Sequence, residues 1–237
     1  MDQETLKLAR ILVEKLAKYA LDVTQTGLGI SGVPASGKST FSELLTTHVN
    51  NLLTSAGYSS SSALLIGMDG WHLSRAQLDE FPDPKLAHDR RGSHWTFDAL
   101  GYVSFIRSLR GPLTPHTLVL TAPSFDHALK DPTYDDIIIR PYHRIVVIEG
   151  LYTLLSIPPW NEAGHLLDER WHLDVGIDEC RQRLIKRHVA TGVAKDIEEA
   201  IWRAEENDIP NGRFVIANML KPTRSIRSIE DPFLLAP

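Results

Sequence analysis

Cysteine is almost absent from this sequence, since Cys180 is the only one in 237 residues. A single cysteine excludes an internal disulfide and a cysteine-rich zinc site. Because structural disulfides belong to oxidising compartments, this scarcity predicts a cytoplasmic location. Zinc-ligand spacings and the G-x-S-x-G nucleophile elbow are missing too, so neither pattern of hydrolytic chemistry is indicated.

Long apolar runs and blocks of one charge are also missing. No run approaches the roughly 20 apolar residues that a transmembrane helix requires. Residues 3–20 mix acidic and basic side chains with apolar ones at helical spacing, which predicts an amphipathic helix rather than a signal or transit peptide. The net charge is −5 and is spread along the chain. We therefore expect neither a membrane partner nor a nucleic-acid partner.

The most specific pattern present is G-x-x-x-x-G-K-[ST], the phosphate-binding loop. With the threonine that follows, its residues are Gly32, Val33, Pro34, Ala35, Ser36, Gly37, Lys38, Ser39 and Thr40. The two glycines permit a crowded or left-handed backbone that turns its N–H groups toward an anion. Lys38 would supply a positive charge to the β- and γ-phosphates, and the Ser39 hydroxyl would bind a phosphate-bound Mg²⁺.

The flanking sequence predicts an α/β fold. Apolar stretches predict strands at residues 28–31, 63–68, 118–121, 135–140, 144–148 and 171–177. Helices are predicted at residues 40–55, at 97–109 with Thr96 as N-cap, at 179–190, and at 198–221 with a break near Pro210 that Asp208 and Asn211 would cap. Such alternation predicts a mostly parallel sheet, with ligands beyond the carboxyl ends of the strands.

One domain is expected over residues 1–237, because the length suits a single large α/β unit. Its parts would be an N-terminal helix over 1–24, an acceptor-side loop or lid over 71–97, and a basic lid helix over 179–195. Residues 71–97 are polar and interrupted by prolines, which is typical of a functional loop.

Two carboxylates follow apolar strands and should meet in one cleft with the phosphate loop. Asp69 lies at a strand end near the phosphate loop, so it is a candidate to orient the acceptor hydroxyl, accept its proton or contact Mg²⁺. The alternative is an aspartate that caps a helix or shapes a turn before a glycine. Glu149 ends the most hydrophobic strand, where a lone carboxylate is costly without a cation. A metal ion would satisfy Glu149, and so would a lysine or arginine.

The helix at 179–190 carries a basic face. Arg183, Lys186 and Arg187 lie three or four residues apart and so share one side of the helix. Such a face can close over ATP and stabilise the transferred charge, with Arg183 and Arg187 as the candidate catalytic arginines. A solvated basic surface is the alternative.

The acceptor pocket is predicted from loop residues with aromatic, basic and acidic side chains. The candidates are His72, Arg90, Arg91, Phe125, Asp126 and His127. They suit a polyhydroxylated or ring-bearing metabolite, although each could instead be satisfied within its own loop. Asn-Lys-x-Asp and the leucine-serine-glycine-glycine transporter signature are absent, which favours ATP and a small-molecule acceptor.

With these motifs the chain resembles the phosphoribulokinase/uridine kinase branch of P-loop kinases, over roughly residues 26–190. The resemblance rests on residues 32–40, on Met-Asp-Gly-Trp-His at 68–72, on Val-Val-Ile-Glu-Gly at 146–150 and on the basic helix at 181–188. It implies a three-layer αβα P-loop NTPase fold with a small lid. It also implies ATP, Mg²⁺ and phosphorylation of a metabolite hydroxyl, with Asp69 as catalytic acid and Glu149 as metal-associated acid.

The acceptor region departs from this family. Uridine kinases carry a Tyr-Asp-x-x-x-His segment, whereas residues 123–132 read Pro-Ser-Phe-Asp-His-Ala-Leu-Lys-Asp-Pro. Residues 91–98 look more like those of pantothenate-kinase-like members. Uridine or cytidine is the first expectation, with pantothenate, nicotinamide riboside or a sugar as alternatives. A non-catalytic ATP-binding regulator is the competing class, and a homo-oligomer is possible on either view.

Overall fold

A five-stranded sheet forms the centre of the computed structural model, which describes residues 2–18, 24–114, 116–126 and 128–229. The strand order is β2-β5-β1-β6-β7, and every neighbouring pair is parallel. The strands are β1 (Thr26–Gly32), β2 (Ala63–Gly67), β5 (Ile145–Glu149), β6 (Glu169–Asp174) and β7 (Arg224–Arg227). The predicted parallel sheet is thus confirmed.

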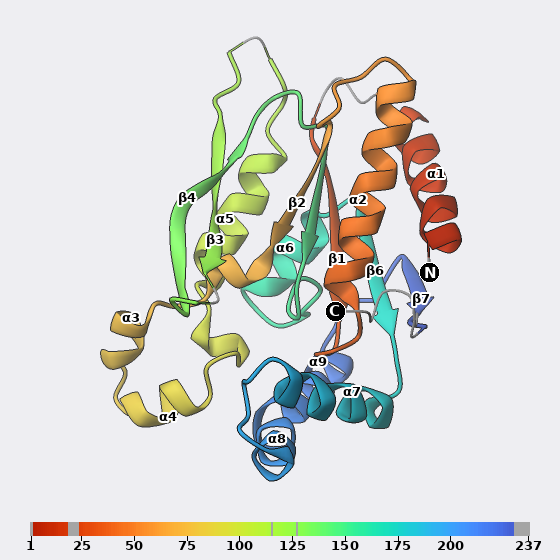
Figure 1. Ribbon diagram of the computed structural model, residues 1–237. Coiled ribbons are helices and arrows are strands. Elements are labelled where there is room, and N and C mark those ends of the chain that lie inside the picture. Colours follow the sequence, from red (N-terminus) through yellow and green to blue (C-terminus); the bar gives the residue numbers. More distant parts are fainter. Residues whose placement is uncertain (1, 19–23, 115, 127, 230–237) are drawn as a thin grey trace.

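Helices cover both faces of this sheet (Figure 1). In β5, Ile145 and Val147 pack into the cluster that contains α1 (Asp2–Lys18) and α2 (Lys38–Ser55). Val146 and Ile148 point the other way, into the cluster formed with α5, α6 and α9. The bounds of those helices are Ala99–Leu109, Trp160–Leu166 and Ile209–Ala217. A strand buried on both faces is apolar throughout, which is why β5 reads as an unbroken hydrophobic run.

Two of the predicted strands lie outside this sheet. β3 (Leu120–Asp126) and β4 (Asp131–Ile139) pair with each other as an antiparallel hairpin. The prediction that they alternate with helices in the parallel sheet was wrong, because the short connection between them is far below the dozen residues that a parallel crossover needs. Phe125 and Asp126, expected in a loop, belong to β3.

The predicted loop over 71–97 contains short helices. After β2 come η1 (Met68–Trp71), α3 (Arg75–Asp79), α4 (Pro84–Asp89) and η2 (His94–Thr96). Ser74 begins α3 with a capping box to Gln77, and Asp83 caps α4 just before a proline. Thr96 does not cap α5, because its hydroxyl donates to the Ser93 carbonyl; Asp98 accepts from Gly101 N instead.

The C-terminal part adds a small helical unit. α7 (Ile177–Ala190) and α8 (Ile197–Arg203), which we call the lid, are followed by the π turn (Ala204–Asp208) and α9. The break predicted near Pro210 is this π turn, and the proline itself lies in the first turn of α9. Asp208 was predicted to cap a helix, but its side chain makes no cap hydrogen bond there.

The N-terminal helix is confirmed as α1, while residues 1 and 19–23 of the predicted 1–24 segment lie outside the described residues. Across the described ranges, none of the helices has both the length and the apolarity needed to cross a bilayer.

Candidate active site

The phosphate loop connects β1 to α2, as the motif requires. β1 ends at Gly32 and α2 begins at Lys38. A Cβ on Gly32 would lie 2.4 Å from Ser36 Oγ, so a side chain there would clash. Gly37 has a φ of 83°, in the left-handed region that favours glycine. The first turn of α2 holds no acidic residue, which leaves the positive end of its dipole available to an anion.

Strand register brings the two predicted acids to this loop. Glu149 of β5 pairs with Ile30 of β1 on one side and with Gly67 of β2 on the other. Asp69 follows Gly67 by two residues, in η1. The three chain segments therefore meet at the carboxyl edge of the sheet, although they are far apart in sequence.

The glycines after the two acids allow this close approach. A Cβ on Gly150 would lie 2.3 Å from the Cβ of Met68, the residue that precedes Asp69. A Cβ on Gly70 would lie 2.1 Å from the Pro123 carbonyl oxygen of β3. The Asp-Gly and Glu-Gly pairs are thus packing requirements as well as chemical ones.

Glu149 is the buried acid of the pair. Burial raises the pKa of its carboxyl, an effect that the Lys38 ammonium opposes and the Asp69 carboxylate reinforces. Ser39 Oγ donates to Glu149 Oε1 at 3.3 Å. Oε2 is buried and accepts no hydrogen bond from the described part of the chain. An orphaned carboxylate oxygen next to a hydroxyl fits Mg²⁺, which prefers oxygen ligands and retains several waters.

Asp69 is the accessible acid. Its side chain is 50% exposed, and His72 Nδ1 lies 2.8 Å from its carbonyl oxygen and 4.0 Å from its Oδ1. The His72 ring packs between Phe97 and Phe125, with centroid distances of 3.9 and 4.9 Å. The structure therefore places a half-exposed carboxylate next to a cluster of largely buried rings, His72, Phe97 and Phe125, which we call the aromatic floor. Phe97 was not predicted.

Arg183 contacts the phosphate loop from the lid. Its Nη1 donates to the Ala35 carbonyl at 3.4 Å and to Ser228 Oγ at 3.0 Å, while Nη2 pairs with Glu179. Ser228 in turn donates to the Ser36 carbonyl at 2.7 Å. Arg183 thus supports the outer backbone of the loop, and its contact with a transferred phosphate stays a prediction. Arg187 is exposed on α7.

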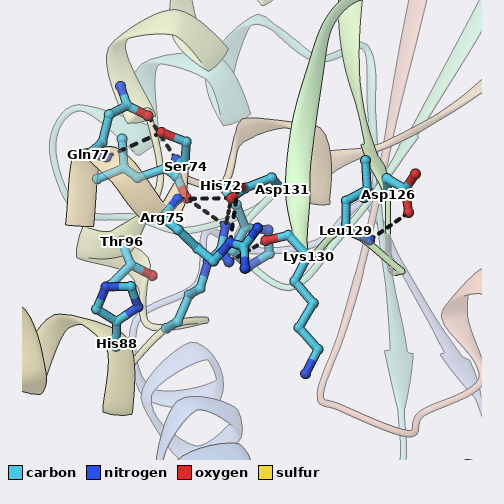
Figure 2. A network of polar contacts seen from close by, with 12 residues as sticks. His72, Ser74, Arg75, Gln77, His88, Thr96, Asp126, Leu129, Lys130 and Asp131 are labelled. Carbon is cyan, nitrogen blue, oxygen red and sulfur yellow. Dashed lines mark hydrogen bonds and ion pairs between the residues drawn. The ribbon is translucent and has the colours of Figure 1, made fainter. Parts of the chain in front are cut away.

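Arg91 is engaged with the β3–β4 hairpin. Its guanidinium donates to the Leu73 carbonyl at 2.8 Å, to Asp131 Oδ1 at 3.0 Å and to the Lys130 carbonyl. It also lies over the Phe125 ring at 5.5 Å. Arg75 is the other partner of Asp131, to which both its backbone N–H and its guanidinium donate (Figure 2). Arg91 therefore joins the hairpin to the loop after η1.

Asp131 is held as a carboxylate by these contacts. Burial alone would raise its pKa, but hydrogen bonds from the Arg75 backbone and side chain and from Arg91 outweigh burial and lower it. Asp126, by contrast, accepts from the backbone N–H groups of Ala128 and Leu129 and so shapes the hairpin turn (Figure 2). His127 lies outside the described residues.

A second set of polar contacts was not anticipated. Residues 90–94, which we call the acceptor-side turn, are tied to the C-terminal helices and to Tyr152. Tyr152 donates to the Gly92 carbonyl at 2.8 Å, and burial raises the pKa of its phenol. Asn207 Nδ2 donates to the Arg91 carbonyl at 3.1 Å, and Asn211 accepts from Ser93 Oγ at 3.2 Å. The pair of asparagines four residues apart was the only sequence signal for this contact.

Comparison with known proteins gives the family. No protein-family profile matches the chain. The Schizosaccharomyces pombe protein named "Putative uridine kinase C227.14" is 40% identical over 195 residues, which are 82% of this chain and 80% of that protein. The chain belongs to the uridine kinase-like family of P-loop kinases. A second relative, "ATP-dependent kinase-like protein notR'" of Aspergillus versicolor, is 44% identical over 65% of this kinase and 89% of that protein.

Solved structures agree on the fold of this kinase. The crystal structure of YFH7 from Saccharomyces cerevisiae superposes with a TM-score of 0.82, at 24% identity, over 95% of this chain and 99% of that chain. The P-loop kinase fold is therefore shown, and the relatives support ATP as the phosphate donor.

Proposed function

We propose that this kinase transfers the γ-phosphate of ATP to a hydroxyl of a nucleoside-like metabolite, with uridine or cytidine first. The observation that carries the proposal is the division of labour between two neighbouring carboxylates. Glu149 is buried with an orphaned oxygen, as a metal-associated acid needs, whereas Asp69 is half exposed and free of such burial.

On the donor side, residues 32–40 would hold the phosphates, with Lys38 neutralising the β- and γ-phosphates. Ser39 and Glu149 would hold Mg²⁺, directly or through a bound water, with Asp69 as a further candidate ligand. A metal ion held by these residues would supply positive charge against the negative charge that develops during transfer.

On the acceptor side, Asp69 would orient the acceptor hydroxyl and take its proton. The hydroxyl oxygen forms a bond to the γ-phosphorus while the bond to the β-phosphate oxygen breaks, and ADP leaves. The partly buried ring of His72 lies next to Asp69 and packs on Phe125, which supports a ring-bearing acceptor. The name of the Schizosaccharomyces pombe relative points to the same class.

The test is ADP release from the purified protein with MgATP and a panel of acceptors: uridine, cytidine, pantothenate, nicotinamide riboside, glycerate and pentoses. Uridine or cytidine should give the highest kcat/KM. The Asp69→Asn variant should bind ATP normally and lose about 100- to 10,000-fold in kcat, the usual contribution of a general base.

Each competing function has its own outcome in this experiment. Stimulation by pantothenate, nicotinamide riboside or a sugar alone would reassign the acceptor within the same family. ATP binding without stimulation by any acceptor would favour a non-catalytic regulator. Full activity of Asp69→Asn with the best acceptor would contradict the role of Asp69. A small-molecule partner without nucleic acid or membrane, a homo-oligomer and a cytoplasmic location stay predictions.

A further inference from the structure

The π turn divides its contacts between two parts of the molecule, the lid and the acceptor-side turn. Glu205 pairs with Arg181 of α7, and the Glu206 carbonyl accepts from Arg90. Asn207 donates to the Arg91 carbonyl at 3.1 Å, and Asp208 Oδ2 lies 2.8 Å from His188 Nε2 of α7. The outer two residues of this run, Glu205 and Asp208, therefore contact the lid, and the inner two, Glu206 and Asn207, contact the acceptor-side turn.

Both ends of this connection reach the substrate sites. On the lid side, α7 carries Arg183, which donates to the Ala35 carbonyl of the phosphate loop. On the other side, the acceptor-side turn includes Arg91, which donates to the hairpin residue Asp131 and lies over Phe125. The connection therefore runs from the ATP loop to the aromatic floor beside Asp69.

Further contacts make the acceptor-side turn follow the C-terminal helices. His94 stacks on Phe214 of α9 with a centroid distance of 4.6 Å and an interplanar angle of 9°. A pocket of about 420 Å³ lies at the same junction, where Leu86 lines it from α4, His188 and Trp202 line it from the lid, and Asn207 and Asp208 line it from the π turn. The π turn is therefore the place where α4 and the lid face each other.

The interruption of the helix is itself informative. A π-helical turn inserted between α8 and α9 departs from regular helix geometry, and such turns are frequent at functional sites. It rotates successive side chains so that Glu205 and Asp208 reach α7 while Asn207 reaches the Arg91 carbonyl.

We propose that Asn207 and the His188–Asp208 pair are positioning residues that couple lid closure over ATP to the placement of the acceptor-side turn. Nucleotide binding that draws the lid toward the phosphate loop then orders residues 90–94 for the acceptor. This inference rests on the proposed function, in which ATP and the acceptor bind at two adjoining sites. It gives the π turn the role of connecting these sites, without contact to either substrate.

The test is amide hydrogen exchange of the full chain with and without a non-hydrolysable ATP analogue and Mg²⁺. In the wild type, the analogue should slow exchange both in residues 32–41 and in residues 90–96, the latter by about fivefold or more, the low end of coupling between sites. Asn207→Ala and His188→Leu each remove one arm of the connection, since neither new side chain can form the hydrogen bond that the original makes. Each should keep the protection of residues 32–41 and lose that of residues 90–96.

Glu206→Ala is the matched control, because Arg90 contacts the carbonyl of Glu206 and the substitution retains that carbonyl. It should behave as the wild type. The coupling would be contradicted if residues 90–96 stayed protected in both variants. It would also be contradicted if the analogue protected residues 32–41 of the wild type but not residues 90–96, and in either case nucleotide binding would still stand. Absence of protection in residues 32–41 of the wild type would overturn nucleotide binding and, with it, this inference. If one of the two variants does not fold, the other decides.

Discussion

At the scale of single residues, Glu149 is expected to lower the stability of the nucleotide-free protein while serving its activity. Its carboxyl is buried, one of its oxygens lacks a donor within the described chain, and burial raises its pKa. Burial therefore disfavours the ionised carboxylate relative to the unfolded chain, whereas Mg²⁺ would favour it. Active-site groups of this kind commonly cost stability until their ligand is bound.

We expect Glu149→Gln to stabilise the nucleotide-free protein at pH 7 by about 0.5–2 kcal/mol, the range usual for stabilising substitutions. The folded-state pKa lies above the unfolded value, so the folded wild type binds more protons between the two and loses stability as the pH rises through that window. The advantage of the glutamine should accordingly vanish below the ordinary carboxyl pKa. Urea unfolding of both proteins across the acid range measures this.

Activity should change in the opposite direction. Glu149→Gln should lower Mg²⁺-dependent ADP release by about 10- to 100-fold, as loss of a group that orients a metal does. Glu43→Gln is the control, because Glu43 is an exposed carboxylate on α2 whose charge also acts on Glu149. A Glu149→Gln protein that is less stable than the wild type at neutral pH would contradict the argument.

At the scale of elements, the docking of the hairpin on η1 depends on Gly70. A Cβ there would lie 2.1 Å from the Pro123 carbonyl oxygen, and a backbone atom cannot rotate away. We expect Gly70→Ala to destabilise the protein by about 1–3 kcal/mol, the usual cost of overpacking. Because Asp69 is the adjacent residue, kcat should fall as well.

Thermal unfolding and kcat of Gly70→Ala measure these two effects. Gly67→Ala is the control: its Cβ would meet only Glu149 Oε1 at 3.9 Å, an ordinary contact, so its stability should stay within about 0.5 kcal/mol of the wild type. Equal stability of the two variants would show that β3 can shift without cost.

The sequence predicted those elements whose surroundings are uniform. Residues 145–148 of β5 are all apolar because both faces of the strand are buried, so its place in the parallel sheet could be inferred. β4 is mostly exposed, and nothing in its own residues indicates which strand it pairs with. The short helices after β2 depend on caps such as Ser74 and Asp83, which the prolines nearby obscured.

Among the candidate site residues, too, those in local motifs could be named from the sequence and those with distant partners could not. The phosphate loop, Asp69 and Glu149 lie within local motifs, so their types and spacing were enough to name them. The contacts of Asn207 and Ser228 join segments more than 100 residues apart, and a lone polar residue does not indicate such a partner. Arg91 was predicted as an acceptor ligand, whereas the folded chain supplies it with intramolecular acceptors.

At the scale of the whole molecule, nucleotide binding should be visible as stability. ATP would contact the loop between β1 and α2, and through Arg183 the lid, so binding to the folded state alone raises the free energy of unfolding. An ATP analogue with Mg²⁺ at 100 times its Kd should add about 2.7 kcal/mol. For a domain of this size that corresponds to a rise in Tm of about 5–10 °C.

Lys38→Ala should remove most of this rise, because Lys38 is the loop cation expected on the β- and γ-phosphates. Lys85→Ala removes the same charge from α4, where the side chain is 86% exposed and pairs only locally with Asp89, and should retain the full rise. Differential scanning fluorimetry of the three proteins, with and without the analogue, separates the cases. An equal rise in Lys38→Ala would mean that the nucleotide binds elsewhere, and the two-substrate site at the carboxyl edge of the sheet would lose its donor half.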